Sequence, residues 1–323
     1  MSATRPHPGP TDSIRDVPGV LLGQVEIGAG APATPDTGVS AIVVPTGAVG
    51  AVDVRGAAPG TRETDALGPL ASGERVHAVL LVGRSVFGLA AADGAVEELE
   101  RRGIGLPLAW DGRSAVIPIV AAAVLFDLGH GDPARRPTPA DGRRAIRAAL
   151  RSSGERPAAG SVGAGVGAWT GGIVGPRRKG GIGHASLRIE RPGGLLVVGA
   201  TVVVNAAGAV RPDGRFGNPG PLPDLDDIAI ARGQTTLAVV ATNARLSKAR
   251  LAQVAAMGHD GLARTIRPVH SGVDGDAVFA LATPEPAVEV HAWGPAAVTI
   301  VGALAADAVA RAVADAMRAA GAG

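Results

Sequence analysis

The chain has 323 residues, of which 46% are apolar, and it carries a formal net charge of only +2 with no cysteine. That length and apolar content can bury a large core. The absence of cysteine excludes disulfides, a cysteine nucleophile and thiolate metal sites. With 2% aromatic residues and no tyrosine, the chain lacks the stacking side chains expected of a nucleic-acid-binding protein.

The N-terminal segment is rich in proline and polar residues, so we expect residues 1–13 to form a disordered leader. It contains no apolar stretch of the kind found in secretory signals, which predicts a cytoplasmic protein. Apolar runs such as 195–204 stop after about ten residues, half of what a bilayer-crossing helix needs. We therefore expect no membrane span.

Apolar patterning predicts strands and helices along the whole chain, with no internal repeat and no domain linker, so residues 1–323 are expected to form one domain. The segment 115–128 fits either a strand or a buried helix, and the glycine-rich passage 45–67 is expected to be a loop. Predicted strands cover 20–27, 39–44, 76–82, 186–190, 195–204, 236–242 and 278–282. One predicted helix ends near residue 102, and three others cover 145–152, 247–257 and 296–320.

A serine in the sequence GRSVFG follows a predicted strand and precedes a predicted helix, which is the setting of a serine-hydrolase nucleophile elbow. The elbow requires glycine two residues after the serine, and Phe87 stands there instead. Ser85 is therefore predicted to be the N-cap of the helix, where its hydroxyl would accept an unpaired N–H.

Two further patterns are weak signals for a cofactor or a metal. Residues 160–183 are dense in glycine, but no helix and ribose-binding acid follow as in a dinucleotide fingerprint. Such glycines allow close backbone approach, which suits the floor of a pocket. His130 and Asp132 lack a second ligand pair at a workable spacing. We expect no cofactor and no metal.

The stretch ARGQTTLAVVATNAR at 231–245 is the most informative in the chain. A turn-rich loop ends at Gly233, and two threonines then open an apolar run that is typical of a buried strand. A hydroxyl residue at that position is often an ordinary polar group at a sheet edge. Thr235 could instead be a nucleophile, and the residues alone leave both interpretations open.

Several long motifs in fixed order carry a family resemblance that covers nearly the whole chain. They are DVPGV, AVDVRGAAPGTRETD, FGLAAADG, AVLFDLG, KGGIG, VVVNAAG, TTLAVVATNARLSKA and DGDAVFALAT. In these motifs the chain resembles the DmpA-type peptidases, which include β-peptidyl aminopeptidases, a D-aminopeptidase and nylon-oligomer endohydrolases. The resemblance implies a four-layer αββα fold of the N-terminal-nucleophile type and a precursor that cuts itself into two associated subunits. It also implies homo-oligomers.

By the same resemblance, the scissile bond lies between Gln234 and Thr235, which gives subunits 1–234 and 235–323 with Thr235 as nucleophile. Cleavage would free the α-amino group of Thr235 to act as general base, and its ordinary pKa of about 7.7 to 8.0 suits that task.

The other implied site residues have roles in the same chemistry. The side-chain amide of Asn205 would stabilise the oxyanion. Lys179 would lie beside the nucleophile and keep its amine unprotonated. Asp274 and Asp276 flank a glycine, so in an extended segment both carboxylates point to one side, where they could orient Thr235 and hold the amine.

The leading prediction is a self-processing amide hydrolase that acts on a short peptide or small amide. The alternative is an unprocessed relative that binds small amines or peptides without turnover, and a serine hydrolase based on Ser85 is a third hypothesis. The sequence leaves open whether the substrate is an α-peptide, a β-peptide, a D-residue amide or a synthetic oligomer.

Overall fold

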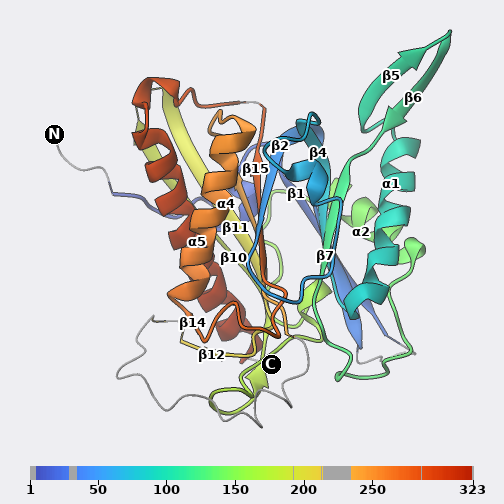
Figure 1. Cartoon of the computed structure of the whole chain (residues 1–323), viewed down its shortest axis with the longest axis vertical. Helices are drawn as coiled ribbons and strands as arrows, with labels where there is room; N and C mark the ends of the chain where they lie inside the picture. The colour runs from blue at the N-terminus through green and yellow to red at the C-terminus, as the bar shows by residue number, and fades with distance from the viewer. Residues whose placement is uncertain are drawn as a thin grey trace.

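The computed structural model of the chain describes residues 5–28, 35–191, 193–211, 213, 234–284 and 286–321. Figure 1 shows two pairs of helices on opposite sides of a body of strands. The helices are α1 (Ala91–Arg101), α2 (Pro139–Leu150), α4 (Lys248–Ala263) and α5 (Ala296–Ala320). The long strands are β1 (Leu21–Ile27), β2 (Thr37–Val54), β4 (Arg75–Val82), β7 (Val120–Val124), β10 (Gly181–Arg191), β11 (Gly194–Val204), β13 (Leu237–Thr242) and β15 (Ala277–Ala282).

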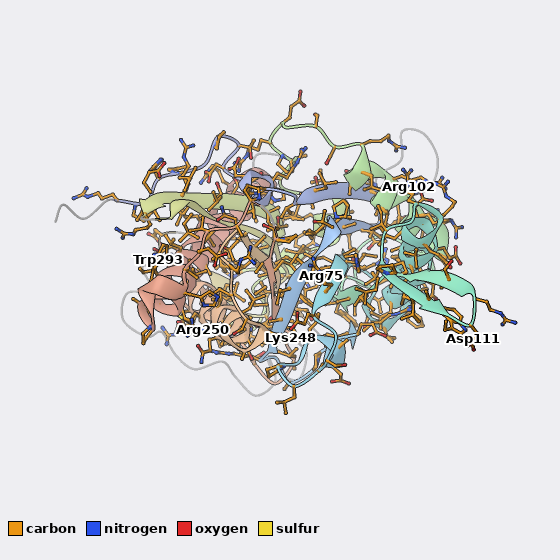
Figure 2. All side chains as sticks on the ribbon, turned by 90° about the horizontal axis from the view of Figure 1, so that it is seen from above. Arg75, Arg102, Asp111, Lys248, Arg250 and Trp293 are labelled. Carbon is orange, nitrogen blue, oxygen red and sulfur yellow. The ribbon has the colours of Figure 1, made fainter. Side chains whose placement is uncertain are left out.

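The remaining strands are short or lie away from the main sheet. They are β3 (Thr61–Arg62), β5 (Leu106–Trp110), β6 (Arg113–Ile117), β8 (Trp169–Thr170), β9 (Arg178–Lys179), β12 (Ala209–Val210) and β14 (Ile266–Arg267). β5 and β6 form a hairpin that projects from the body (Figure 1). Figure 2 shows Asp111 at its tip, well clear of the other elements. Three large apolar side chains on this hairpin are exposed, namely Leu108, Trp110 and Ile117.

Strand β2 is long enough to belong to two halves of the sheet. Residues 37–43 pair with β1, the segment up to Val49 pairs with β4 with a register shift between Val43 and Ala48, and Val49–Val54 pair with β15. Three separate apolar clusters lie on and between these halves. One lies between α4, α5 and the β10–β11–β13–β15 half, one between the two halves, and one between the β1–β2–β4–β7 half and α1, α2. The layers are thus helix, strand, strand, helix, which confirms the predicted αββα class.

Residues of β13 alternate between the two sides of their layer. Val239 belongs to the cluster between the sheet halves, whereas Val240 packs toward the helices. Both sides are buried, so the strand consists of a continuous apolar run with no polar alternation. This explains why the sequence 237–242 could be assigned to a strand without difficulty.

The strand order brings the ends of four strands to one edge of the sheet. β13 and β15 are parallel neighbours, and β11 is antiparallel to β13. The starts of β13 and β15 therefore lie beside the end of β11, as the pairs Val203–Leu237 and Leu237–Ala277 show. β10 is antiparallel to β11, so its start lies at this edge too.

Helix α5 is the one helix in the described ranges whose length and composition would suffice to cross a membrane. Of its most apolar window, 56% is buried inside the molecule. The helix packs on β10, β11 and α4, and Ala308, Val309 and Ala312 in its middle are buried in the adjoining core. A core helix of a layered fold accounts for the apolar run.

Two expectations from the sequence are changed, and one alternative that the sequence left open is decided. The passage 45–67 is not all loop, because β2 continues through Val54. The segment 115–128, for which a strand and a buried helix were both open, contains the end of β6 and all of β7. Residues 5–13 are ordered, unlike a disordered leader, since main-chain pairing joins His7 to Arg188. Most of the turn-rich stretch 210–232 lies outside the described residues.

Ser85 is not the N-cap that the sequence suggested. It is the first residue of a short 3-10 helix, Ser85–Ala90, and no side-chain cap is formed there. The capping position is Arg84, whose backbone is left-handed with a φ of 70°. The buried partners of Arg84, described below, hold this conformation and leave Ser85 no capping role.

Candidate active site

Thr235 and Thr236 occupy the two positions before β13 and are buried, with 4% and 0% of their surface exposed. The N–H of Thr235 donates to the main-chain oxygen of Asn205 at 2.6 Å. Its hydroxyl donates to the carbonyl oxygen of Gln234, also at 2.6 Å. The hydroxyl of Thr235 therefore lies against the carbonyl group of the Gln234–Thr235 peptide bond.

The segment Asp274–Gly275–Asp276 runs alongside this strand start. The N–H of Gly275 donates to the carbonyl oxygen of Gln234 at 3.0 Å, and Oδ1 of Asp276 accepts the N–H of Thr236 at 2.7 Å. The segment thus holds the main chain on both sides of Thr235. In the part of the chain that is described, neither carboxylate is hydrogen-bonded to the hydroxyl of Thr235.

Asp274 is 2% exposed and is held mainly by Ser271. Its Oδ2 accepts the N–H of Ser271 at 3.0 Å and the hydroxyl of the same residue, and its Oδ1 accepts the N–H of Ala207 at 3.4 Å. Burial, together with the nearby carboxylate of Asp276, raises the pKa of Asp274 to about 6 despite the Ser271 hydrogen bonds. This carboxyl group therefore changes charge close to neutral pH.

A raised pKa predicts how the stability of the fold depends on pH. Between the ordinary pKa of 3.8 and the folded value of about 6, the folded state binds the extra proton, so stability falls as pH rises through this window. The expected loss is about 3 kcal/mol at about 1.4 kcal/mol per pKa unit. Urea unfolding at about pH 4 and about pH 7 would measure the loss of stability by comparing the chain with its Asp274→Asn variant, with Thr235→Val present in both so that neither chain can be cut. Parallel pH dependence in the two proteins would contradict this assignment.

Asn205 follows β11 and is 1% exposed. Its side-chain oxygen accepts the N–H of Trp169 at 2.9 Å, and its Nδ2 donates to the main-chain oxygen of Phe126 at 3.0 Å. An amide nitrogen carries two hydrogens, so Nδ2 keeps one for another acceptor. Its main-chain oxygen accepts the N–H of Thr235, so Asn205 contacts Thr235 directly.

The glycine-dense segment 160–183, expected to form a pocket floor, places the main chain of Trp169 against the side chain of Asn205. A Cβ on Gly180 would lie 2.1 Å from the oxygen of Val204 and 3.0 Å from the nitrogen of Trp169. Only glycine permits this approach. The segment therefore determines where the side-chain oxygen of Asn205 points.

The Phe126 carbonyl oxygen, which accepts the hydrogen bond from Nδ2 of Asn205, belongs to a segment held by a buried ion pair. Arg84 is fully buried, and its Nη1 donates to the main-chain oxygen of Asp127 at 2.7 Å. The carboxylate of Asp127 accepts the N–H of Arg84 at 2.6 Å and the hydroxyl of Thr37 at 2.7 Å. Burial raises the pKa of Asp127, although these partners oppose the shift. The amide of Asn205 is thus supported on a rigid frame.

Lys179 reaches the same edge through β9, which pairs with the strand containing Trp169. Its Nζ donates to the main-chain oxygen of Val166 and lies 5.1 Å from the centre of the Trp169 ring. Burial lowers the pKa of Lys179, and the Asp127 carboxylate partly offsets this. The structure therefore brings Lys179 close to Asn205 through Trp169, and its predicted contact with Thr235 stays a prediction.

Four residues that position the site were not identified from the sequence: Phe126, Trp169, His270 and Ser271. The first two act through main-chain groups, which carry no residue signature. His270 and Ser271 lie just upstream of the acidic pair in the stretch HSGVDGD. That spacing was the available signal, because short polar side chains bind main chain a few residues away.

Gly275 predicts a sensitive position. A Cβ there would lie 2.8 Å from the hydroxyl oxygen of Thr235 and 2.6 Å from the oxygen of Ala58. We expect Gly275→Ala to displace the hydroxyl and to lower the rate of any Thr235 chemistry by about 100-fold. Amide hydrolysis and fragment formation over time would measure this. Gly272→Ala is the control, since a Cβ there meets nothing within 4 Å, and an equal effect of both variants would contradict the prediction.

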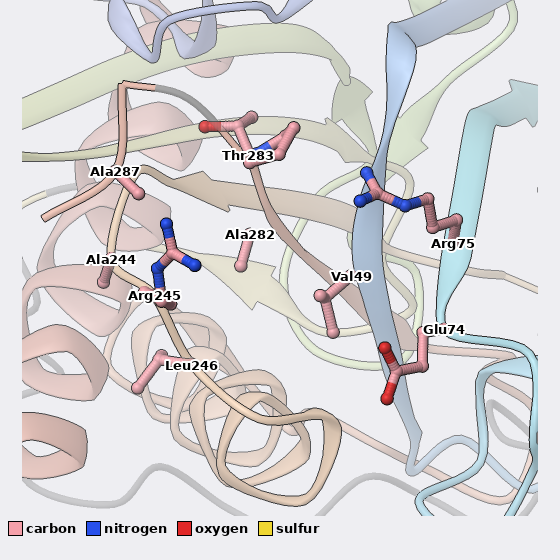
Figure 3. Close-up of a pocket in the computed structure, with 10 residues that line it drawn as sticks. Val49, Glu74, Arg75, Ala244, Arg245, Leu246, Ala282, Thr283 and Ala287 are labelled. Carbon is pink, nitrogen blue, oxygen red and sulfur yellow. The ribbon is translucent and has the colours of Figure 1, made fainter. Parts of the chain in front are cut away.

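Two pockets lie at the other ends of β13 and β15, about 25 to 30 Å from Thr235 at about 3.3 Å per residue. One, of about 220 Å³, is shown in Figure 3. The other, of about 380 Å³, is lined in part by Asn243 and Val288. Neither adjoins the threonine. The first is lined by Val49, Glu74, Arg75, Ala244, Arg245, Leu246, Ala282, Thr283, Pro284 and Ala287.

Comparison with solved structures defines the class of fold. A β-aminopeptidase of Burkholderia sp. superposes with a TM-score of 0.73 at 21% identity, over 99% of this chain and 90% of that one. The L-aminopeptidase D-Ala-esterase/amidase of Ochrobactrum anthropi gives 0.72 at 22% identity, over 97% and 88%. The latter structure is described as a variant of the Ntn-hydrolase fold. The present chain has that fold.

Sequence comparison then identifies the family. An uncharacterised aminopeptidase of Mycobacterium leprae is 41% identical over 94% of this chain and 89% of its own length. A 6-aminohexanoate-oligomer endohydrolase of Paenarthrobacter ureafaciens is 32% identical over 84% of this chain and 74% of its own length. The chain matches peptidase family S58 over residues 12–322 and belongs to it. The resemblance to DmpA-type peptidases is thereby confirmed, and the protein is a hydrolase of peptide or amide bonds.

Proposed function

We propose that the protein cleaves itself between Gln234 and Thr235 and then hydrolyses the amide bonds of short peptides or small amides with Thr235 as N-terminal nucleophile. The observation that carries the proposal is the 2.6 Å contact between the Thr235 hydroxyl and the Gln234 carbonyl oxygen. The N–H of Gly275 donates to the same oxygen. A nucleophile and an oxyanion donor therefore meet at one carbonyl group.

Self-cleavage starts when Oγ1 of Thr235 adds to the carbonyl carbon of Gln234. The negative charge that develops on the carbonyl oxygen is stabilised by the Gly275 N–H. The C–N bond then breaks as the nitrogen takes up the proton that the Thr235 hydroxyl has lost, which leaves an ester between Gln234 and Oγ1. Water hydrolyses this ester to the carboxylate of Gln234 and a free Thr235 with an α-amino group.

In turnover, the free amine of Thr235 removes the proton from its own hydroxyl as Oγ1 attacks a substrate carbonyl. The main-chain oxygen of Asn205, which binds the Thr235 N–H before cleavage, orients that amine. The second hydrogen on Nδ2 of Asn205 would stabilise the substrate oxyanion. Lys179, whose pKa is lowered by burial, supplies positive charge that disfavours protonation of the amine.

The relatives favour two substrate groups, because their names denote aminopeptidases and a 6-aminohexanoate-oligomer endohydrolase. We propose short peptides or amino-acid oligomers as the substrate class, no cofactor, and action in the cytoplasm. We also propose a homo-oligomer. The apolar, projecting β5–β6 hairpin is a suitable contact for a second copy, since exposed apolar patches mark association surfaces.

Intact-mass analysis of the purified protein tests the proposal. Two fragments are expected, the second beginning at Thr235, and the cleaved protein should hydrolyse members of a panel of α-peptide, β-peptide, D-residue and 6-aminohexanoate amides. A single full-length chain without hydrolysis would refute it. Ligand binding by that full-length chain would favour the alternative, an unprocessed relative that binds small amines or peptides.

A further inference from the structure

His270 precedes the acidic pair Asp274 and Asp276 in the chain and is hydrogen-bonded to Asp276. Its ring Nδ1 is 2.8 Å from Oδ2 of Asp276, and its main-chain N–H donates to the same oxygen at 3.1 Å. We assign the hydrogen of this contact to Nδ1, so that Oδ2 of Asp276 accepts from both the ring and the main chain of His270. The other oxygen of Asp276 accepts the N–H of Thr236. One carboxylate therefore links His270 to the residue after the nucleophile.

The backbone conformation at His270 allows its N–H group and that of Ser271 to reach the two carboxylates. Its φ is 55°, in the left-handed region that non-glycine residues seldom occupy. In this conformation the successive N–H groups of His270 and Ser271 donate to Asp276 and Asp274, respectively. Consecutive N–H groups of this kind form an anion-binding nest. A strained residue that holds two buried acids is an observation that points to function.

A second histidine fixes the ring of His270 from the side. His259 of α4 is fully buried, and its ring packs edge-to-face on that of His270 with centroids 4.6 Å apart. Nε2 of His259 lies 2.9 Å from the main-chain oxygen of Asp53, which requires a hydrogen on that nitrogen. Burial lowers the pKa of His259 to about 4, so it packs as a neutral ring.

We propose that His270 is a positioning residue for the chemistry of Thr235. Its ring donor and its N–H fix Oδ2 of Asp276, so that Oδ1 holds the N–H of Thr236 and with it the main chain that presents the nucleophile. This inference rests on the proposed function. It adds a residue that makes no hydrogen bond to Thr235 among the described residues and that acts through Asp276.

Three substitutions separate the donor from the backbone conformation. His270→Asn keeps a donor near the position of Nδ1 and tolerates a left-handed backbone. His270→Asp has the same size and backbone tolerance but presents an acceptor to Asp276. His270→Gly removes the side chain without a backbone penalty. Each variant would be purified as the full chain, and self-cleavage, kcat, KM and melting temperature would be measured.

We expect His270→Asp and His270→Gly to lower kcat and the rate of self-cleavage by about 10- to 100-fold, with KM within about threefold, because the nucleophile is misplaced and binding is not. His270→Asn should restore kcat to within about fivefold of wild type. If His270→Gly does not fold, the comparison of kcat between His270→Asn and His270→Asp still tests whether the ring donor is needed.

Equal kcat in the asparagine and aspartate variants, at similar melting temperatures, would overturn the inference, as would a change confined to KM. These results are distinct from failure of the proposed function. That failure would appear in the wild-type protein as the absence of cleavage between Gln234 and Thr235.

Discussion

Thr235→Val is expected to yield one uncleaved chain whose amide hydrolysis is reduced by about 10⁴-fold or more, the range found when a nucleophile is removed. Valine replaces the hydroxyl by a methyl group and preserves the shape of the side chain, so the buried strand start should remain packed. The loss would come from the missing Oγ1, which lies 2.6 Å from the Gln234 oxygen. Intact mass and hydrolysis of the active substrates would measure both effects.

The neighbouring threonine is a matched control. Thr236 is equally buried, and its hydroxyl has no hydrogen-bond partner in the described part of the chain. Thr236→Val therefore removes an unpaired polar group, which is neutral or stabilising. We expect this variant to be cleaved and active within about threefold of wild type. Cleavage at the same bond in Thr235→Val would show that another group performs the reaction.

Most of the fold could be predicted because its strands are buried on both faces. Segments such as 195–204 and 237–242 are continuous apolar runs, and the structure places strands there. The extent of β2 could not be predicted. Its second half contains Gly47, Gly50 and Asp53, which is a loop-like composition, and it is a strand because β15 supplies its hydrogen-bond partners. Tertiary pairing overrode local propensity there.

The site was predictable to the extent that its members carry side-chain chemistry. Thr235, Asn205, Asp274 and Asp276 have the residue types and motifs of the family, and the strand order brings all four to one edge. The contacts that position them could not be predicted. Phe126 and Trp169 contribute main-chain groups, and such groups are present at every residue.

One main-chain oxygen links the two states of the proposed enzyme. Before cleavage, the oxygen of Asn205 accepts the peptide N–H of Thr235. After cleavage, the nitrogen of Thr235 is an amine that still has hydrogens to donate to that oxygen. The amine is therefore formed in an orientation that already exists, so little rearrangement is needed between self-cleavage and turnover. Preorganisation of this kind is a main source of catalytic rate.

Asn205→Asp is expected to lower kcat by about 10²- to 10³-fold, the usual effect of removing one oxyanion donor. The substitution keeps the shape of the side chain and the acceptor for the N–H of Trp169. It replaces Nδ2 by an oxygen, which can neither donate to Phe126 nor stabilise an oxyanion. KM should change less than kcat, because the lost interaction forms chiefly in the transition state. Steady-state kinetics on the active substrates would measure it.

Asn243 provides the control, because it makes the same kind of contacts at the far end of β13. Its side-chain oxygen accepts the N–H of Val197 at 2.9 Å, its Nδ2 donates to the oxygen of Leu195 at 3.0 Å, and it is 4% exposed. Asn243→Asp should therefore lose about the same stability, about 1 to 3 kcal/mol, as Asn205→Asp. Only the change at Asn205 should reduce kcat beyond about threefold, since only Asn205 contacts Thr235, through its main-chain oxygen. If both variants lose activity in proportion to their melting temperatures, Asn205 serves stability alone and the oxyanion donor must be sought among other N–H groups, beginning with Gly275.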